Sequence, residues 1–167
     1  FGNTAIEPAL VFNYLPVKRV RLAVKAAHKF MVPDSVEARV PGSEGDILPG
    51  PETKERISRK TGDSSTIGGA VNLAVWGDFS IAGGYEFTAK NADKYSGNRG
   101  ARYDILAKES DSQAHKAKLG LAYDTIGLYQ RTKSFPPLKL DFEVVNTFKG
   151  KNSDRQLVNE LSLSMFF

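Results

Sequence analysis

The chain has 167 residues, of which 41% are hydrophobic, and a net charge of +4 at neutral pH. This length suits one domain with its own core. No stretch approaches the ~18 consecutive apolar residues of a transmembrane helix, which excludes a helical membrane protein. Cysteine is absent, which excludes disulfides, thiolate metal sites and cysteine nucleophiles. Lysine and arginine are dispersed along the chain, so nucleic-acid binding is not predicted.

Seven stretches alternate between apolar and polar residues with the period of two that is typical of β-strands. They cover residues 6–15, 19–30, 66–76, 79–90, 115–125, 138–148 and 156–167. The second stretch is the clearest, with apolar residues at even positions and basic residues at most odd ones. Helical periodicity is nearly absent. The sequence therefore predicts an all-β, antiparallel fold.

The connections between these stretches differ greatly in length. Residues 31–65 and 91–114 are long polar segments, rich in Gly, Pro, Ser and charge, and are predicted to be surface loops. Within them, residues 54–60 could make a single helical turn, and residues 103–107 could add a strand. The shorter connections are marked by Pro16, Gly77–Asp78, Pro136–Pro137 and residues 150–155. Because antiparallel strands alternate in direction, both long loops and the 150–155 turn fall at one end of the sheet, and the other connections fall at the opposite end.

The last stretch carries a specific resemblance. Its apolar residues are Leu161, Leu163, Met165 and Phe167. They alternate with glutamate and serine, and the sequence ends on an aromatic residue. This stretch resembles the closing strand of Gram-negative outer-membrane β-barrels, and the resemblance implies that these four residues form the signal read by the barrel-insertion machinery.

Short turns at one end and long loops at the other are also the pattern of outer-membrane barrels. We therefore expect residues 1–167 to form a single antiparallel transmembrane β-barrel unit of seven or eight strands. Bacterial single-chain barrels have even strand numbers. Seven strands thus predict the C-terminal part of a larger barrel, whose remaining strands precede Phe1 or lie on another chain. A strand at residues 103–107 would instead make a complete eight-stranded barrel.

Two segments resemble the outer-membrane transporters of fatty acids and aromatic hydrocarbons. They are EPALVFNYLPVKRVRLAVKAAHKF (residues 7–30) and KLGLAYDTIGLYQRTKSFPPLKLDFEVVNTFKGKNSD (residues 118–154), which precedes the terminal LSLSMFF. The resemblance implies a fourteen-stranded barrel with passive, ligand-gated uptake and no chemistry. The plug and hatch of that family would precede Phe1, so no functional residue is carried over.

Polar residues at alternate strand positions are the candidates for lining the lumen of such a barrel. They are Arg19, Arg21, Lys25, Lys29, Asn72, Glu86, Lys116, Lys118, Lys139, Asp141, Glu143 and Glu160. The basic ladder in residues 19–29 would favour anionic solutes. The alternative is ordinary solvation of the lumen, with opposite charges on neighbouring strands stabilising the wall.

Aromatic residues are predicted to form girdles at both ends of the strands. One group comprises Phe12, Tyr14, Trp76, Phe79, Phe166 and Phe167, and the other comprises Phe30, Phe87 and Phe148. A soluble aromatic core would scatter such residues along the strands instead.

Catalytic chemistry is not predicted. The only histidines, His28 and His115, show neither metal-ligand spacing nor a recognisable order with a nucleophile. Pairing His115 with Ser110 or Ser112 would imitate an outer-membrane lipid hydrolase, but nothing favours it. Asp141 and Glu143 are two residues apart on one strand and are expected to pair with cations. We predict no enzyme, metal or cofactor.

The function expected from these features is passive diffusion of small hydrophobic or amphipathic solutes across the bacterial outer membrane. Its partners would be outer-membrane lipid, the insertion machinery and the remaining strands of the barrel. One alternative is a scaffold barrel that binds other envelope proteins through its long loops. Another is a soluble β-sandwich that binds a ligand or a surface.

Overall fold

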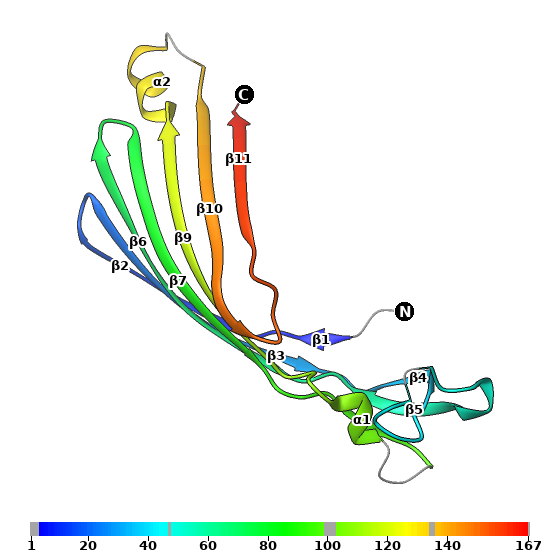
Figure 1. Ribbon diagram of the computed structural model, residues 1–167. Helices are drawn as coiled ribbons and strands as arrows, with labels where there is room; N and C mark the ends of the chain where they lie inside the picture. Colours follow the sequence, from blue (N-terminus) through cyan, green and yellow to red (C-terminus); the bar gives the residue numbers. More distant parts are fainter. Residues whose placement is uncertain (1–3, 47, 99–102, 134–135, 167) are drawn as a thin grey trace.

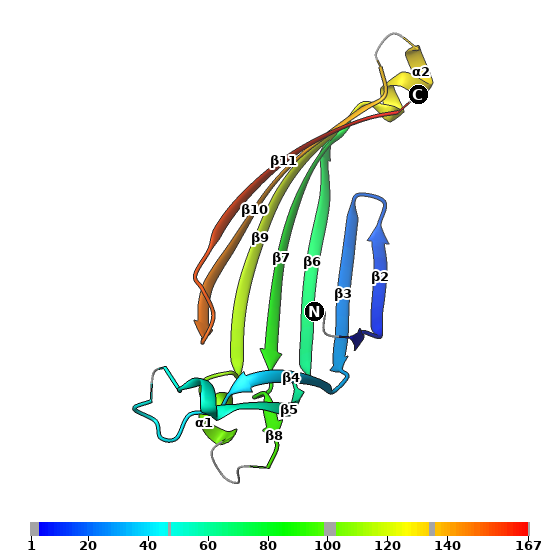
Figure 2. The ribbon, with the colours of Figure 1, turned by 90° about the vertical axis from the view of Figure 1, so that its right-hand side faces the viewer.

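The computed structural model describes residues 4–46, 48–98, 103–133 and 136–166, which form two antiparallel sheets (Figures 1 and 2). The large sheet contains β1 (Ala5–Ile6), β2 (Ala9–Val17), β3 (Val20–Met31), β6 (Ser64–Trp76), β7 (Phe79–Lys90), β9 (Ser112–Asp124), β10 (Leu138–Lys151) and β11 (Leu157–Met165). Its order is β2-β3-β6-β7-β9-β10-β11, and the short β1 pairs with the far end of β3. Each long strand therefore lies beside the long strands that precede and follow it.

All seven predicted strands are confirmed, with small changes at their ends. Pro16 lies inside β2 and not in the turn, which is formed by Lys18 and Arg19. Proline lacks a backbone donor and is tolerated on an outer strand. The β2–β3 register is also irregular between Tyr14 and Val17. The predicted Gly77–Asp78 turn is confirmed, and Gly77 adopts a positive φ of 54°.

The register keeps apolar residues on one face across the whole large sheet. One unbroken cross-strand row consists of Val20, Leu73, Ile81, Leu121, Phe142 and Leu161. Paired residues in antiparallel strands project to the same face. This apolar face is uncovered: Leu119 is 65% exposed and Leu161 70% exposed. The large sheet therefore has no hydrophobic core of its own among the described residues.

The connections sort to opposite ends of the large sheet, as the strand directions predict (Figure 2). The end with the Lys18–Arg19 and Gly77–Asp78 turns, here called the turn end, also carries helix α2 (Ile126–Thr132). This helix was not predicted, and it lies in the connection that the sequence marks by Pro136–Pro137. The opposite loop end carries both long segments and the turn after β10.

The long segments are not irregular loops, which corrects the prediction. They form a small sheet of β4 (Asp34–Arg39), β5 (Lys54–Lys60) and β8 (Lys94–Ser96), with a 3₁₀ turn η1 (Pro51–Thr53) and helix α1 (Tyr103–Ala107). The predicted helical turn at residues 54–60 is strand β5, and the predicted strand at residues 103–107 is α1.

A compact core explains these differences. Ile57 of β5 and Val40 are almost completely buried, and Tyr103 of α1 is 6% exposed. Val36, Ala38, Tyr95 and Leu106 pack around them. In the sequence, Ile57 stands alone among charged neighbours, so its burial could not be foreseen from alternation within β5. Burial against α1 selects the strand over the helical turn.

A bidentate ion pair joins β4 to β5 beside this core. Arg59 donates from Nε to Asp34 Oδ1 (3.0 Å) and from Nη2 to Asp34 Oδ2 (2.6 Å). The hydrogen bonds from Arg59 hold the pKa of the Asp34 carboxyl below its ordinary value of 3.8.

No helix among the described residues is long and apolar enough to cross a membrane.

The Asp34–Arg59 ion pair makes the stability of the small sheet decrease at acidic pH. Because the folded pKa is lowered, the unfolded chain binds the proton first, and the stabilisation present above pH 3.8 is lost as pH falls through the folded pKa. We expect the exchange protection factor of the Ile57 amide to decrease over this acid range. The Asp34→Asn variant should show a smaller decrease, and Ser35→Ala should behave as wild type. Equal acid responses in wild type and Asp34→Asn would contradict this assignment.

Candidate functional site

The polar face of the large sheet gathers most of the predicted site residues. One cross-strand row consists of Arg21, Asn72, Ala82, Gly120, Glu143 and Glu160. The registers of neighbouring pairs place Lys25, Lys29, Glu86, Lys116, Lys118, Lys139 and Asp141 on this same face. Arg19 alone does not occupy its predicted strand position, because it lies in the turn between β2 and β3. Its carbonyl accepts the Ala74 amide there (2.8 Å).

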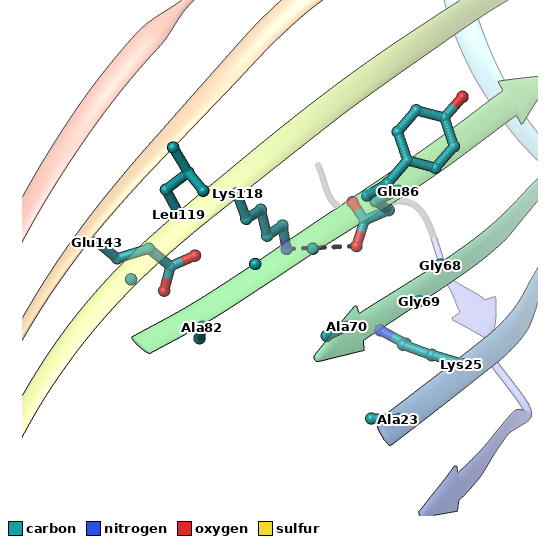
Figure 3. A pocket seen from close by; sticks show the side chains of 14 residues that line it. Ala23, Lys25, Gly68, Gly69, Ala70, Ala82, Glu86, Lys118, Leu119 and Glu143 are labelled. Atoms are coloured by element: carbon teal, nitrogen blue, oxygen red, sulfur yellow. Dashed lines mark hydrogen bonds and ion pairs between the residues drawn. The ribbon is translucent and has the colours of Figure 1, made fainter. Parts of the chain in front are cut away.

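A hollow of about 310 Å³ lies at the centre of this face (Figure 3). Its floor crosses strands β3, β6, β7 and β9 and consists of glycine and alanine. These floor residues are Ala23, Gly68, Ala70, Ala82, Gly84 and Gly120. Charged side chains surround the floor: Lys25, Glu86, Lys118 and Glu143. Figure 3 shows Leu119 directed away from the hollow, toward the apolar face.

The sheet itself does not require glycine at every floor position. A Cβ at Gly120 would lie 3.5 Å from the Ala82 Cβ, which is an ordinary contact. A Cβ at Gly68, in contrast, would lie 3.0 Å from the Tyr85 carbonyl oxygen, a tight contact with backbone that favours glycine there. The open space above Gly120 is therefore not explained by strand packing, and it leaves room for a molecule that approaches the polar face.

Glu86 is the electrostatic centre of the hollow. Its carboxylate lies between two lysines on the neighbouring strand, 3.8 Å from Lys116 Nζ and 3.4 Å from Lys118 Nζ. The Glu86 side chain is only 20% exposed. Opposite charges therefore meet across the neighbouring strands β7 and β9 at this position.

The charges at the two margins of the hollow are not neutralised in this way. Among the described residues, the ion pairs do not include Lys25 on β3. On the other side, Glu143 stands directly opposite Glu160 on β11. Like charges in direct register are unfavourable. The polar face is thus cationic toward β3 and anionic toward β11.

Asp141 pairs with Lys139 of the same strand (2.8 Å) and not with Glu143. The expectation that Asp141 has a cationic neighbour is therefore confirmed. The 120 Å³ hollow beside Asp141 is lined by Asn72, Ser80, Ala82, Gly120, Leu121, Ala122, Phe142 and Glu143. No group of three or more metal-ligating side chains occurs in the part of the chain that the structure describes.

The two histidines lie on the apolar face near the loop end. His115 Nδ1 is 2.6 Å from the Tyr85 hydroxyl, and its ring contacts Phe87 at a centroid distance of 4.8 Å. Ser110 instead bonds Ala107 and Asp93. Ser112 begins β9, three residues before His115, and its register places it on the polar face. The partner of His115 is therefore Tyr85 and neither of these serines.

His28 has a partner that the sequence reading missed. Its Nδ1 is 2.8 Å from the Ser65 hydroxyl. The two residues are directly opposite in the β3–β6 register, 37 positions apart in sequence. Only the strand pairing could have revealed this contact.

Aromatic residues gather at both ends of the apolar face, although not all as predicted. Trp76 is opposite Phe79, and Phe79 is opposite Tyr123, at the turn end. Phe148 joins Tyr85 and His115 near the loop end, and Phe30 contacts His28 there with a centroid distance of 4.3 Å. Phe12 is an exception, because it lies in the middle of β2. Tyr14 and Phe166 lie toward the turn end, and Phe167 is outside the described residues.

Neither the scan of protein-family models nor the search of curated proteins found a match for this chain. The resemblance to hydrocarbon and fatty-acid transporters therefore rests on the residues quoted for it.

The Cβ distances at the floor of the hollow predict different stability changes for two glycine substitutions. Gly120→Ala should change the free energy of unfolding by less than about 1 kcal/mol, because the added methyl makes an ordinary contact and glycine weakens a strand. Gly68→Ala should cost about 1–3 kcal/mol, since its methyl would press on a backbone carbonyl. Urea unfolding of both variants under the same conditions measures the difference. Equal costs would show that strand packing alone dictates the glycines.

Proposed function

We propose that the large sheet is part of the wall of an outer-membrane β-barrel through which small hydrophobic or amphipathic solutes diffuse passively. The observation that carries this proposal is the pair of opposite faces, one continuously apolar and exposed and the other charged and hollowed. Lipid outside and water inside a barrel require this arrangement. A soluble protein rarely leaves so large an apolar surface uncovered.

The dimensions of the apolar face support the proposal. Its strands have 9 to 14 residues, and a transmembrane strand requires about 9–11. The aromatic residues Phe79 and Phe87 lie near opposite ends of β7. Their spacing corresponds to ~27 Å along the strand, or about 21 Å across the membrane at a tilt of ~40°. A lipid-facing band is about 25 Å tall.

The directions of the outer strands constrain how a barrel would close. Successive pairs from β2 to β11 are all antiparallel, so β2 and β11 run in the same direction. An antiparallel wall that joins them needs an odd number of further strands. Those strands would come from another segment of the barrel or from another chain, which agrees with the even total of bacterial barrels.

The hollow on the polar face supports passage of solutes with an apolar surface. Its floor of glycine and alanine offers methyl groups and backbone, while the Glu86 carboxylate balances one of its two neighbouring lysines. A solute with an apolar surface could therefore slide along this floor. The resemblance to hydrocarbon and fatty-acid transporters points to the same class of solute.

A second candidate is a scaffold barrel that binds other envelope proteins. The observation that favours it is the folded small sheet at the loop end, with a core of Val40, Ile57 and Tyr103. A rigid surface of this kind suits recognition better than a mobile loop would. Like the first candidate it is a β-barrel, but its lumen would be closed to solutes.

The proposal is tested by heat-dependent migration of the protein purified from membranes in mild detergent. We expect the unboiled sample to migrate differently from the boiled one on a denaturing gel, because a closed sheet without free edges resists detergent until it is heated. Recovery in the aqueous fraction with no change on boiling would support the β-sandwich and contradict the barrel.

Two neighbouring positions on β9 provide a matched control. Leu121→Arg would place a charge on the apolar face, between its middle and the turn-end aromatic residues, and should lower stability in lipid by about 1–3 kcal/mol. Ala122→Arg introduces the same side chain on the polar face and should have little effect.

Flux through the hollow is tested separately. In planar bilayers, Gly120→Leu should reduce conductance roughly twofold or more, because its side chain would occupy the hollow. Gly83→Leu is the control: Gly83 is a neighbour on the apolar face, and a Cβ there would meet nothing closer than 4.0 Å. Unchanged conductance in Gly120→Leu, or no conductance in wild type, would favour the scaffold.

A further inference from the structure

The outer face of the small sheet concentrates charges of one sign. Alternate residues of β4, β5 and β8 project away from the Val40–Ile57–Tyr103 core. The charged residues on this outward side are Arg39, Lys54, Arg56, Lys60, Lys94 and Glu37. We call this surface the basic face. It has five cations and one carboxylate.

Like charges face one another directly in this sheet. Arg39 is opposite Lys54 across β4 and β5, and Lys60 is opposite Lys94 across β5 and β8. Such pairs destabilise an antiparallel sheet when nothing compensates for them. Two of them on one face of a three-stranded sheet indicate a surface built for an anionic partner.

The local carboxylates compensate for only part of this charge. Glu37 pairs with Lys54, which holds the pKa of the Glu37 carboxyl below its ordinary value. Asp63, in the connection from β5 to β6, pairs with Lys60 at 2.9 Å. Within the described residues, no ion pair involves Arg39, Arg56 or Lys94. Arg39 donates from Nη1 to the Pro49 carbonyl (3.3 Å), and Arg56 lies directly opposite Glu37 in the β4–β5 register. None of the three cations has a carboxylate of the described residues within ion-pair distance, so each keeps charge that a ligand can use.

Asp63 also fixes the basic face beside the loop end of the apolar face. Its Oδ1 accepts the Met31 amide of β3 (2.8 Å), and its Oδ2 accepts Lys60 of the basic face (2.9 Å). The Met31 amide, Lys60 and, more weakly, His28 lower the pKa of the Asp63 carboxyl. His28 belongs to the apolar face, in the row where that face becomes polar: His28, Ser65, Ala89, Gln113 and Lys151.

We propose that the basic face binds the phosphate groups of anionic lipid headgroups. Lys60 and Lys94 lie beside the loop end, where the apolar face ends, and Arg56, Lys54 and Arg39 lie farther along β5 and β4. The end of the apolar face is the depth of the headgroups if that face contacts lipid. Arginine and lysine both bind phosphate oxygens, and Arg39 and Arg56 can do so in a bidentate manner. The choice of lipid as the source of phosphate rests on the membrane role proposed above, whereas the phosphate chemistry rests on the small sheet alone.

The test measures lipid selection by the purified full-length protein. The protein is equilibrated in detergent micelles with equimolar phosphatidylglycerol and phosphatidylcholine, and bound lipids are counted by native mass spectrometry. We expect at least about fivefold enrichment of phosphatidylglycerol, since one cation near an anionic surface contributes a factor of that size. The enrichment should decrease at high salt, which screens exposed charges.

The decisive variant removes the three available cations: Arg39→Gln, Arg56→Gln and Lys94→Gln. Its enrichment should fall below about twofold. The matched control, Lys18→Gln, Arg131→Gln and Lys133→Gln, removes three cations at the turn end and should keep the wild-type value. The double variant Arg39→Lys and Arg56→Lys keeps both charges and should keep most of the enrichment. It therefore distinguishes loss of charge from misfolding of the small sheet.

Two outcomes would overturn the proposal. One is no enrichment in wild type, and the other is an equal loss in the turn-end control. Binding of inorganic polyphosphate without lipid enrichment would assign the basic face to a soluble polyanion, and would likewise overturn the lipid source. If the enrichment depends on the basic face but boiling does not change migration on the gel, the barrel proposal is contradicted and headgroup binding is still supported.

Discussion

Continuous cross-strand pairing, held in phase over seven strands, is the constraint on which the rest of this structure depends. Two adjacent rows make this clear. The row that begins at Val20 is apolar in all six strands it crosses, and the row that begins at Arg21 is polar or small throughout. A shift of one residue in any one pairing would exchange these faces beyond that strand. The register therefore determines both the apolar face and the hollow.

This two-faced sheet gains little stability from burial of its own side chains. The fully buried residues among those described include Val40 and Ile57, which belong to the small sheet and its surroundings. The strands of the large sheet retain backbone hydrogen bonds, but their leucines and valines remain exposed. In the barrel proposed above, lipid on the apolar face and strands beside β2 and β11 would supply the missing stabilisation. The small sheet differs because it has a core and an internal ion pair, Asp34–Arg59.

The sequence was sufficient for the large sheet because period-two alternation is a local signal. It located all seven strands, and eleven of the twelve predicted polar residues share one face. Arg19 was assigned wrongly because alternation does not reveal where a hairpin turns. The small sheet was missed for a different reason: Ile57 is buried by Val40 and Tyr103, which are distant in sequence. The hollow was missed because alanine and glycine carry no distinctive pattern, and it emerges only when strands β3, β6, β7 and β9 are aligned.

The charged residues form two kinds of cross-strand neighbours, opposite charges and like charges. Where the fold benefits from neutrality, opposite charges meet: Glu86 lies between Lys116 and Lys118, and Asp34 meets Arg59. Elsewhere, like charges are placed in direct register, as in Glu143–Glu160 and Arg39–Lys54. Folding alone gives no reason for such pairs, because either partner could be polar and uncharged at lower cost. Among the described residues, these two like-charged pairs lie at the margin of the hollow and on the outer face of the small sheet, the two surfaces for which an outside partner is proposed.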